Sequence, residues 1–212
     1  MRIDQSRRRF LAGATAASGA MLAAAHLPSR ASRGQDGAKR PKVAALFTVF
    51  HFRSHAYNIL ENFLGPYYFS GQWTDPGVDV VAMYADQFPD NDMAREVSRR
   101  FKIPLFDSIE SALCLGGKEL AVDAVLSIAE HGDYPFNERG QQLYPRKKFF
   151  DQSVAVMKRS GRFVPFFNDK HLSYRWDWSR EMVDTARMNK MPLMAGSSVP
   201  LAQRMPALEI AP

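Results

Sequence analysis

The chain alternates between continuous apolar runs and segments whose apolar residues recur at helical spacing. The continuous runs are rich in β-branched and aromatic residues, as expected of strands buried on both faces of a parallel sheet. The segments with helical spacing predict crossover helices between those strands. The predicted strands are 43–50, 78–85, 103–106, 122–129, 162–167 and 192–195. The predicted helices are 55–64, Asp90 or Asn91 to Phe101, 109–115 with Asp107 or Ser108 as its cap, Pro145 to Ser160, and 179–190.

Strands and helices follow one another in strict alternation between residues 42 and 196, which predicts the α/β class. We expect a Rossmann-like, doubly wound parallel sheet with helices on both faces, in three layers. The last helix is expected to bury one apolar stripe, formed by Met182, Val183, Ala186 and Met188.

Two aromatic stretches stand outside this alternation. Residues 67–77 combine aromatic residues with turn formers, and we interpret them either as a cover over a sheet edge or as the lining of a pocket. Residues 174–178 (YRWDW) allow the same two interpretations. Because they follow Lys170 closely, a functional role is slightly more favoured for them.

The N-terminus carries the pattern of an export signal. Residues 6–11 read SRRRFL and resemble the twin-arginine signal of bacteria, S-R-R-x-F-L. The apolar stretch 11–25 is too short and too rich in alanine and glycine for a comfortable transmembrane helix. We therefore predict a signal peptide over 1–31, read by the twin-arginine export machinery, and a polar linker over 32–41. The mature protein is then expected in the periplasm or cell envelope of a bacterium, with no stable membrane span after cleavage.

Charge and cysteine content exclude several kinds of partner and site. The net charge is +6, but residues 1–31 hold five arginines against one aspartate and so account for four of these charges. The remainder is almost balanced, which argues against a nucleic-acid partner, and we interpret the short cluster 146–148 (RKK) as a solvated helix face. Cys114 is the only cysteine, which excludes an internal disulfide and a cysteine-based zinc site. Its apolar neighbours predict a small buried residue.

Three polar clusters are expected to meet at one edge of the sheet. In a doubly wound sheet the first and fourth strands lie side by side, and ligands bind outside their carboxyl ends. The residues that leave the first, fourth and fifth strands, here named the histidine rim, are His51, Arg53, His55, Glu130, His131, Asp133, Asp169, Lys170 and His171. Three interpretations stay open: a cradle for a sugar or acid ligand with a histidine moving a proton, a metal site, or polar loop residues alone.

Several short segments of the sequence indicate a family resemblance. In these segments the chain resembles the N-terminal domain of the Gfo/Idh/MocA family of NAD(P)-dependent oxidoreductases. These are 78–86 (VDVVAMYAD), 103–113 (IPLFDSIESAL), 122–132 (VDAVLSIAEHG), 159–172 (RSGRFVPFFNDKHL) and 182–198 (MVDTARMNKMPLMAGSS). The resemblance implies NAD or NADP as cofactor and a small, sugar-like substrate.

The resemblance assigns the first turn of the domain to cofactor binding. The family's G-x-G-x-x-G turn corresponds here to Phe47, Val49 and Phe52, and the histidine after it corresponds to His55. Phe47, Val49 and His55 would then face the cofactor, and Asp86 corresponds to the acid that bonds the ribose hydroxyls. Phenylalanine at two glycine positions occupies space that a pyrophosphate needs, which predicts impaired dinucleotide binding.

The family's Glu-Lys-Pro motif corresponds to Asp169-Lys170-His171. The resemblance implies that Lys170 holds cofactor and substrate and that His171 or His131 moves the proton. In the family an α+β domain follows at this point of the chain. We expect the irregular tail 197–212 to be either the start of that domain in a longer protein or the end of a protein that lacks it.

The sequence supports one main hypothesis and two alternatives. The main hypothesis is an exported, Gfo/Idh/MocA-like oxidoreductase-type protein that acts on a sugar-like substrate with NAD or NADP. The first alternative is a non-catalytic Rossmann-fold envelope protein that binds a small ligand or a partner. The second is a metal-dependent enzyme that uses His51, His55 and His131.

Overall fold

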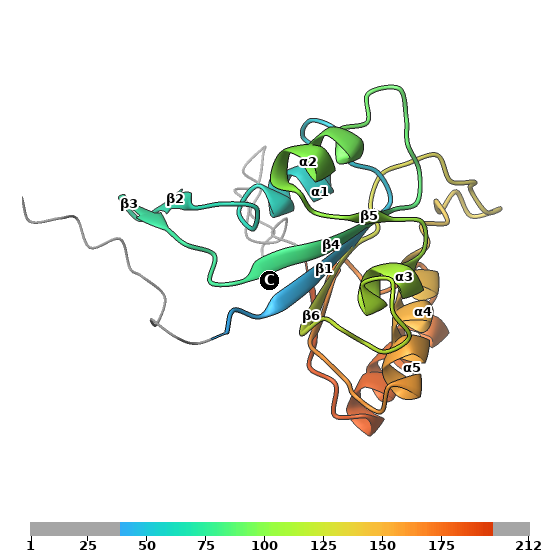
Figure 1. Ribbon diagram of the computed structural model, residues 1–212. Helices are drawn as coiled ribbons and strands as arrows, with labels where there is room; N and C mark the ends of the chain where they lie inside the picture. The colour runs from blue at the N-terminus through green and yellow to red at the C-terminus, as the bar shows by residue number, and fades with distance from the viewer. Residues whose placement is uncertain (1–38, 197–212) are drawn as a thin grey trace, which may run out of the picture. The chain divides into compact units, whose positions relative to one another are not determined.

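The computed structural model describes residues 39–196, which form a six-stranded parallel sheet with helices on both faces (Figure 1). The predicted signal peptide 1–31, all but the last three residues of the linker 32–41, and the tail 197–212 lie outside the described residues. Those predictions stay predictions.

The main sheet has the strand order of a Rossmann domain. Its strands are β1 (Lys42–Phe47), β4 (Asp79–Ala85), β5 (Leu105–Phe106), β6 (Ala124–Ile128), β7 (Phe166–Asp169) and β8 (Leu193–Gly196). They pair in parallel throughout, in the order β5-β4-β1-β6-β7-β8. The order reverses between β1 and β6, which is the switch point where ligands bind in such sheets. The predicted fold class is therefore confirmed.

Helices cover both faces of the sheet, which gives the three predicted layers (Figure 1). The helices are α1 (His55–Leu60), α2 (Ala94–Phe101), α3 (Ile109–Cys114), α4 (Arg146–Arg159) and α5 (Trp176–Met188). Strand β1 serves both sides, because Ala44 and Leu46 pack toward α3, α4 and α5, whereas Ala45 and Phe47 pack toward α1 and α2. Within residues 39–196, no helix is long and apolar enough to cross a membrane.

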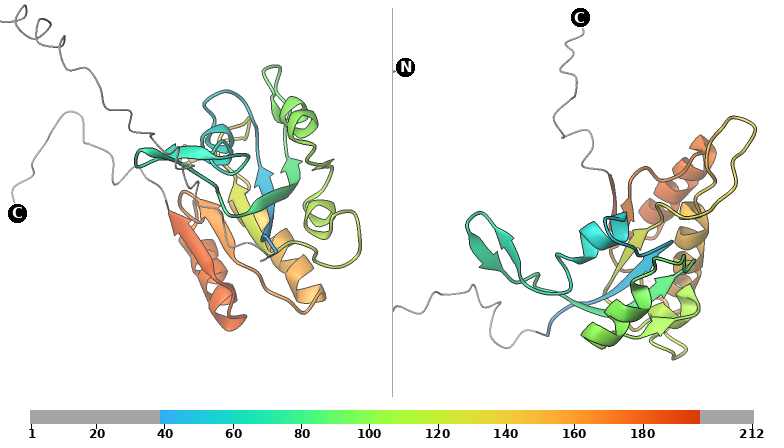
Figure 2. Two further views of the ribbon diagram at one scale, coloured as in Figure 1. Left: turned by 60° about the vertical axis from the view of Figure 1, so that its left-hand side comes forward. Right: turned by 90° about the horizontal axis from the view of Figure 1, so that it is seen from above.

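The aromatic stretch after α1 forms a β-hairpin of its own. Strands β2 (Tyr67–Phe69) and β3 (Gln72–Thr74) pair antiparallel, and Ser70 and Gly71 between them both have positive φ, as a tight hairpin turn requires. The hairpin projects away from the main sheet in the right view of Figure 2. The rings of Tyr68 and Trp73 meet edge-on, with centroids 5.6 Å apart, and remain 65% and 64% exposed. The expectation that this stretch covers a sheet edge or lines a pocket is therefore wrong for these two side chains.

Some element boundaries differ from the prediction for local reasons. Helix α2 begins at Ala94, because the carboxylate of Asp92, not Asp90 or Asn91, accepts the hydrogen bond from its amide at 3.1 Å. Strand β7 begins at Phe166, because Pro165 before it has no amide to donate to a neighbouring strand.

Side-chain burial also tests the sequence. Met182 and Ala186 are buried as predicted, but Met188 ends α5 and is 75% exposed, so its assignment to the buried stripe is wrong. Cys114 is buried, as its apolar neighbours predict. Ser108 caps α3 through a hydrogen bond that its Oγ accepts from the Ser111 amide at 3.1 Å.

Candidate functional site

The turn between β1 and α1 is stabilised by hydrogen bonds among its own residues. Ser54 caps α1, and its Oγ accepts hydrogen bonds from the amides of His51 and Tyr57, both at 3.2 Å. The Thr48 hydroxyl donates to the carbonyl oxygen of Glu130 at 2.6 Å, which ties the turn to the segment after β6. The Tyr57 amide, which could otherwise help to hold an anion at the start of this helix, is therefore engaged within the turn.

The three positions that correspond to the family's glycines have different surroundings. Phe47 is fully buried, and its ring lies 5.4 Å from the ring of Phe50 in the core beneath α1. Val49 is buried as well. Phe52 is 61% exposed and packs edge-on against Tyr57 at 5.3 Å. Phe47 therefore belongs to the core, where it fills the space that a glycine would leave for a ligand.

Asp86 follows β4, at the place of the ribose-binding acid, but its carboxylate has internal partners. The hydroxyls of Tyr84 and Tyr134 donate to its two oxygens, each at 2.7 Å, and the ammonium of Lys148 lies at 3.5 Å. Burial alone would raise the pKa of Asp86, but these bonds outweigh it and hold the pKa below its ordinary value. Tyr134 reaches Asp86 because Gly132 lies against its ring: a Cβ there would stand 2.7 Å from a ring carbon.

These residues do not fit a dinucleotide bound in the manner of the family. A pyrophosphate needs open space and free amides in the turn before α1, and the ribose needs the oxygens of Asp86. Phe47 instead occupies the core directly before this turn, and both Asp86 oxygens accept hydrogen bonds from tyrosine hydroxyls.

The carboxyl ends of β1, β6 and β7 bring part of the histidine rim together, as the sequence predicts. His55, the first residue of α1, and Asp169, the last residue of β7, join across the edge with 2.6 Å between Nδ1 and Oδ2. The Asp169 side chain is only 8% exposed, whereas that of His55 is 26% exposed. A buried carboxylate thus fixes the orientation of an imidazole that still reaches solvent.

His131 joins this pair from the segment after β6. Its ring lies 4.9 Å from that of His55 and 5.8 Å from that of His51, edge-on in both cases. Burial lowers the pKa of His131 below its ordinary value of 6.5, and the positive charge of Lys170 adds to this effect. His131 is therefore neutral at pH 7.

Arg146, at the start of α4, links two further members of the rim. Its guanidinium pairs with Glu130, and its Nη1 lies 3.4 Å from Nε2 of His171. Partial desolvation and the Arg146 charge lower the pKa of His171. Arg146 is 1% exposed, so the interpretation of 146–148 as a solvated helix face is wrong for this residue.

Two of the predicted rim residues point to other partners. The guanidinium of Arg53 lies over the ring of Phe52, with Cζ 5.1 Å from the ring centre. The backbone of Asp133 exchanges two hydrogen bonds with the side chain of Gln87, each at 2.8 Å. Lys170 follows β7 with φ of 67°, and its amide donates to the carbonyl of Gly196 at 2.8 Å.

Sequence reasoning missed three buried polar residues beneath the rim. Ser127 and Asn168 lie side by side on β6 and β7, and Arg146 lies at the start of α4 on the same face of the sheet. In the described part of the chain, the buried side-chain atoms without a hydrogen-bond partner are Ser127 Oγ, His131 Nε2, Arg146 Nε and Asn168 Oδ1. The only signal in the sequence was a polar residue near the end of each strand, which does not distinguish buried from exposed positions.

The described part of the histidine rim does not form a metal site. Among residues 39–196, no three histidine, cysteine, aspartate or glutamate side chains are placed to hold a metal ion. The alternative of a metal-dependent enzyme using His51, His55 and His131 therefore gains no geometric support within that range.

No known protein-family model matches the chain, and no curated protein matches its sequence at a significant level. Solved structures that resemble it include a dehydrogenase from Clostridium difficile, 16% identical with a TM-score of 0.45, the match covering 74% of this chain and 39% of that one. A biliverdin reductase from Synechocystis, in complex with biliverdin and NADP+, is 13% identical with a TM-score of 0.47 and coverage of 74% and 38%.

A further similar structure is an oxidoreductase from Agrobacterium radiobacter in complex with NAD+, L-tartaric acid and magnesium. It is 18% identical with a TM-score of 0.46, and the match covers 74% of this chain and 35% of that one. This chain thus spans less than two fifths of the length of each of the three proteins. Their ligands are properties of those proteins, and the fold of this chain rests on its own strand order.

Proposed function

We propose that this chain is an exported Rossmann-type protein that binds a small, hydroxylated, sugar-like molecule at the histidine rim and accepts a hydrogen bond from one of its hydroxyls. The observation that carries the proposal is the pairing of His55 Nδ1 with Asp169 Oδ2 at 2.6 Å, at the switch point of the sheet. A carboxylate held against one nitrogen of an imidazole leaves the other nitrogen as a proton acceptor.

The chemistry follows from the surroundings of that pair. Asp169 accepts the hydrogen bond from Nδ1–H, so the lone pair of His55 is on Nε2. A ligand hydroxyl donates a hydrogen bond to Nε2, and the Asp169 carboxylate holds the ring in the orientation that receives it. Burial keeps His131 neutral beside this pair.

The experiment measures binding affinity. Glucose, myo-inositol and gluconate are titrated into the protein by calorimetry at pH 7. Because a ligand hydroxyl donates to Nε2 of His55, the His55→Asn variant is expected to bind about tenfold more weakly. His51→Asn is the matched control on the same rim and keeps the affinity. No saturable binding of any probe, or an unchanged affinity in His55→Asn, would overturn the proposal.

An NAD(P)-dependent oxidoreductase of the Gfo/Idh/MocA type is the second candidate. The position of Lys170 directly after β7, close enough for its charge to act on His131, favours it. In this reading Lys170 holds cofactor and substrate and His171 or His131 moves the proton. Titration with NADH and NADPH, followed by tryptophan fluorescence, tests it. A protein that shows no saturable change is not a hydride-transfer enzyme in this form.

Export by the twin-arginine route is part of the proposal, and residues 6–11 support it. The full-length chain is produced in a bacterium that has this route, and the periplasmic and cytoplasmic fractions are compared. Replacing Arg7 and Arg8 together with lysine is expected to retain the protein in the cytoplasm. Arg9→Lys, at the variable position of the motif, is expected to leave export intact. Equal export of both variants would contradict the assignment.

A further inference from the structure

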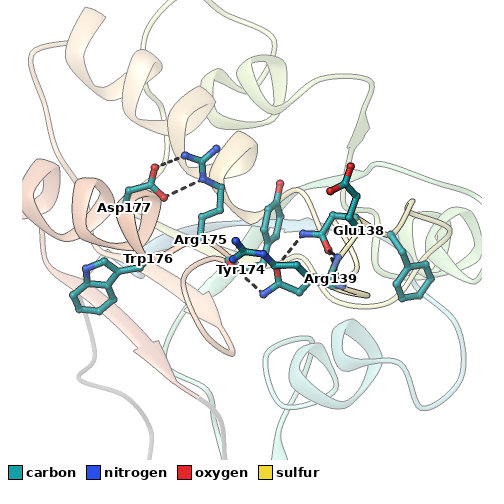
Figure 3. Close-up of a pocket in the computed structure, with 9 residues that line it drawn as sticks. Glu138, Arg139, Tyr174, Arg175, Trp176 and Asp177 are labelled. Atoms are coloured by element: carbon teal, nitrogen blue, oxygen red, sulfur yellow. Dashed lines mark hydrogen bonds and ion pairs between the residues drawn. The ribbon is translucent and has the colours of Figure 1, made fainter.

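A cavity of about 860 Å³ lies between two loops that leave the histidine rim (Figure 3). The loop from β6 to α4 contributes Phe136, Glu138 and Arg139, and the start of α5 contributes Arg175, Trp176 and Asp177. The volume is within the range of ligand pockets, about 300–1,000 Å³. The first of these loops contains His131 and the second begins at Lys170, so the same two loops carry residues of the cavity and of the rim.

The wall formed by the first loop is held in a defined shape. Asn137 Oδ1 accepts hydrogen bonds from the amides of Arg139 and Gln141, both at 3.0 Å, and Asn137 Nδ2 donates to Gln141 Oε1 at 2.9 Å. Gln141 Nε2 in turn donates to the carbonyl of Tyr174 at 3.3 Å, which joins the two walls. A binding surface of this kind loses little conformational entropy when a ligand arrives.

Two aromatic side chains that line the cavity are exposed to solvent and are not buried by the rest of the domain. Phe136 is 64% exposed and Trp176 is 79% exposed, one from each wall. Burying such a side chain inside the domain would stabilise the fold, so its display at a cavity points to a ligand with an apolar face. The C–H face of a sugar ring is such a surface.

The charges of the cavity cancel. Arg175 pairs with Asp177, as the dashed lines in Figure 3 mark. Arg139 and Glu138 add one charge of each sign from the opposite wall, and within the described residues neither side chain forms an ion pair. A polyanion would need a surplus of positive charge here. Planar groups of both signs instead suit the hydroxyls of a neutral sugar, which both donate and accept hydrogen bonds.

We propose that this cavity binds a neutral oligosaccharide, whose terminal unit lies at the histidine rim and whose remaining units stack on Phe136 and Trp176. The inference rests on the proposed function for the position of the terminal unit, but the cavity has its own contacts. It names the substrate class of the site as a sugar chain rather than a single sugar.

The test compares the affinities for a chain and for its monomer. Maltotriose, cellotriose and xylotriose, with glucose and xylose as monomers, are titrated into the full protein and into Trp176→Ala and Phe136→Ala. At least one trisaccharide is expected to bind the unmodified protein about tenfold or more tightly than its monomer. Each variant lowers this ratio toward one and leaves the monomer affinity unchanged. Trp73, on the β2–β3 hairpin, is also exposed, at 64%, and Trp73→Ala is the matched control that keeps the ratio.

The outcomes separate the two proposals. Trisaccharide binding that depends on Trp176 but not on His55→Asn keeps the cavity assignment and removes the role of the rim. Monomer binding that depends on His55, with no gain for any trisaccharide, keeps the rim and overturns the cavity assignment. A preference for trigalacturonate over all neutral chains overturns the neutral class. Because Trp176 is 79% exposed, the melting temperature of Trp176→Ala is expected to match that of the unmodified protein, and Trp176→Tyr is expected to retain the ratio.

Discussion

The carboxyl edge of the sheet has two halves, which differ in how many of their polar groups have hydrogen-bond partners. In the half after β1 and β4, Ser54 accepts hydrogen bonds from two amides of the turn, and the Asp86 carboxylate accepts hydrogen bonds from two tyrosines. In the half after β6 and β7 lie all the buried side-chain atoms that have no hydrogen-bond partner in residues 39–196. An unpartnered buried polar atom costs about 1–3 kcal/mol, so the polar groups of the second half are less fully satisfied than those of the first half. A Rossmann order therefore marks where a ligand binds without deciding which half of the edge holds it.

The largest expected effect tests the claim that the turn after β1 belongs to the core. Phe47→Ala removes a fully buried ring and is expected to lower the free energy of unfolding by about 4 kcal/mol. Phe52→Ala, at another glycine position of the family but 61% exposed, is expected to change it by less than about 0.5 kcal/mol. Urea unfolding of both variants measures the difference. Equal losses would mean that Phe47 does not serve the core in this way.

The next effect concerns the ion pair in the second half. Arg146→Met leaves the Glu130 carboxylate without its partner and is expected to cost about 3 kcal/mol, because a buried pair is destabilised most when one member is removed. The double variant Arg146→Met with Glu130→Gln removes both charges and is expected to recover most of this loss. Urea unfolding distinguishes the two, and equal stability of the single and double variants would show that the pair is not coupled.

The sequence predicts the strand order, because strand-like apolar runs alternate with segments of helical spacing. It also predicts that His51, His55, His131 and Asp169 meet, because the carboxyl ends of parallel strands lie at one edge of the sheet. It does not predict that Arg146 is buried. Three basic residues at the start of a helix are typical of a solvent-exposed face. Arg146 can be buried because its guanidinium pairs with the carboxylate of Glu130, a contact between distant segments. The β2–β3 hairpin was missed although its turn, Ser70-Gly71, carries a known signal. Burial of polar residues is decided by contacts between distant segments, which a local pattern does not contain.

A smaller effect appears as a dependence of stability on pH. Burial lowers the folded-state pKa of His131 below 6.5, so between these two values the unfolded chain binds more protons than the folded one. The contribution of His131 is therefore complete above about pH 6.5 and is lost as the pH falls toward the lowered pKa. His131→Asn is expected to flatten the free energy of unfolding between pH 5 and 7, within the stability range of the fold. An unchanged pH profile in this variant would contradict the burial of that ring.

The smallest expected effect separates the structural role of Ser54 from its place beside the rim. Ser54→Ala removes the oxygen that accepts from the amides of His51 and Tyr57, at a cost of about 1 kcal/mol. Ser108→Ala removes the same kind of cap from α3, a helix of the same six-residue length, and is expected to cost about as much. Only Ser54→Ala loosens the start of the helix that begins with His55, so only this variant is expected to weaken glucose binding in calorimetry. If both caps weaken binding equally, the effect comes from general stability and the rim does not depend on the shape of the turn after β1.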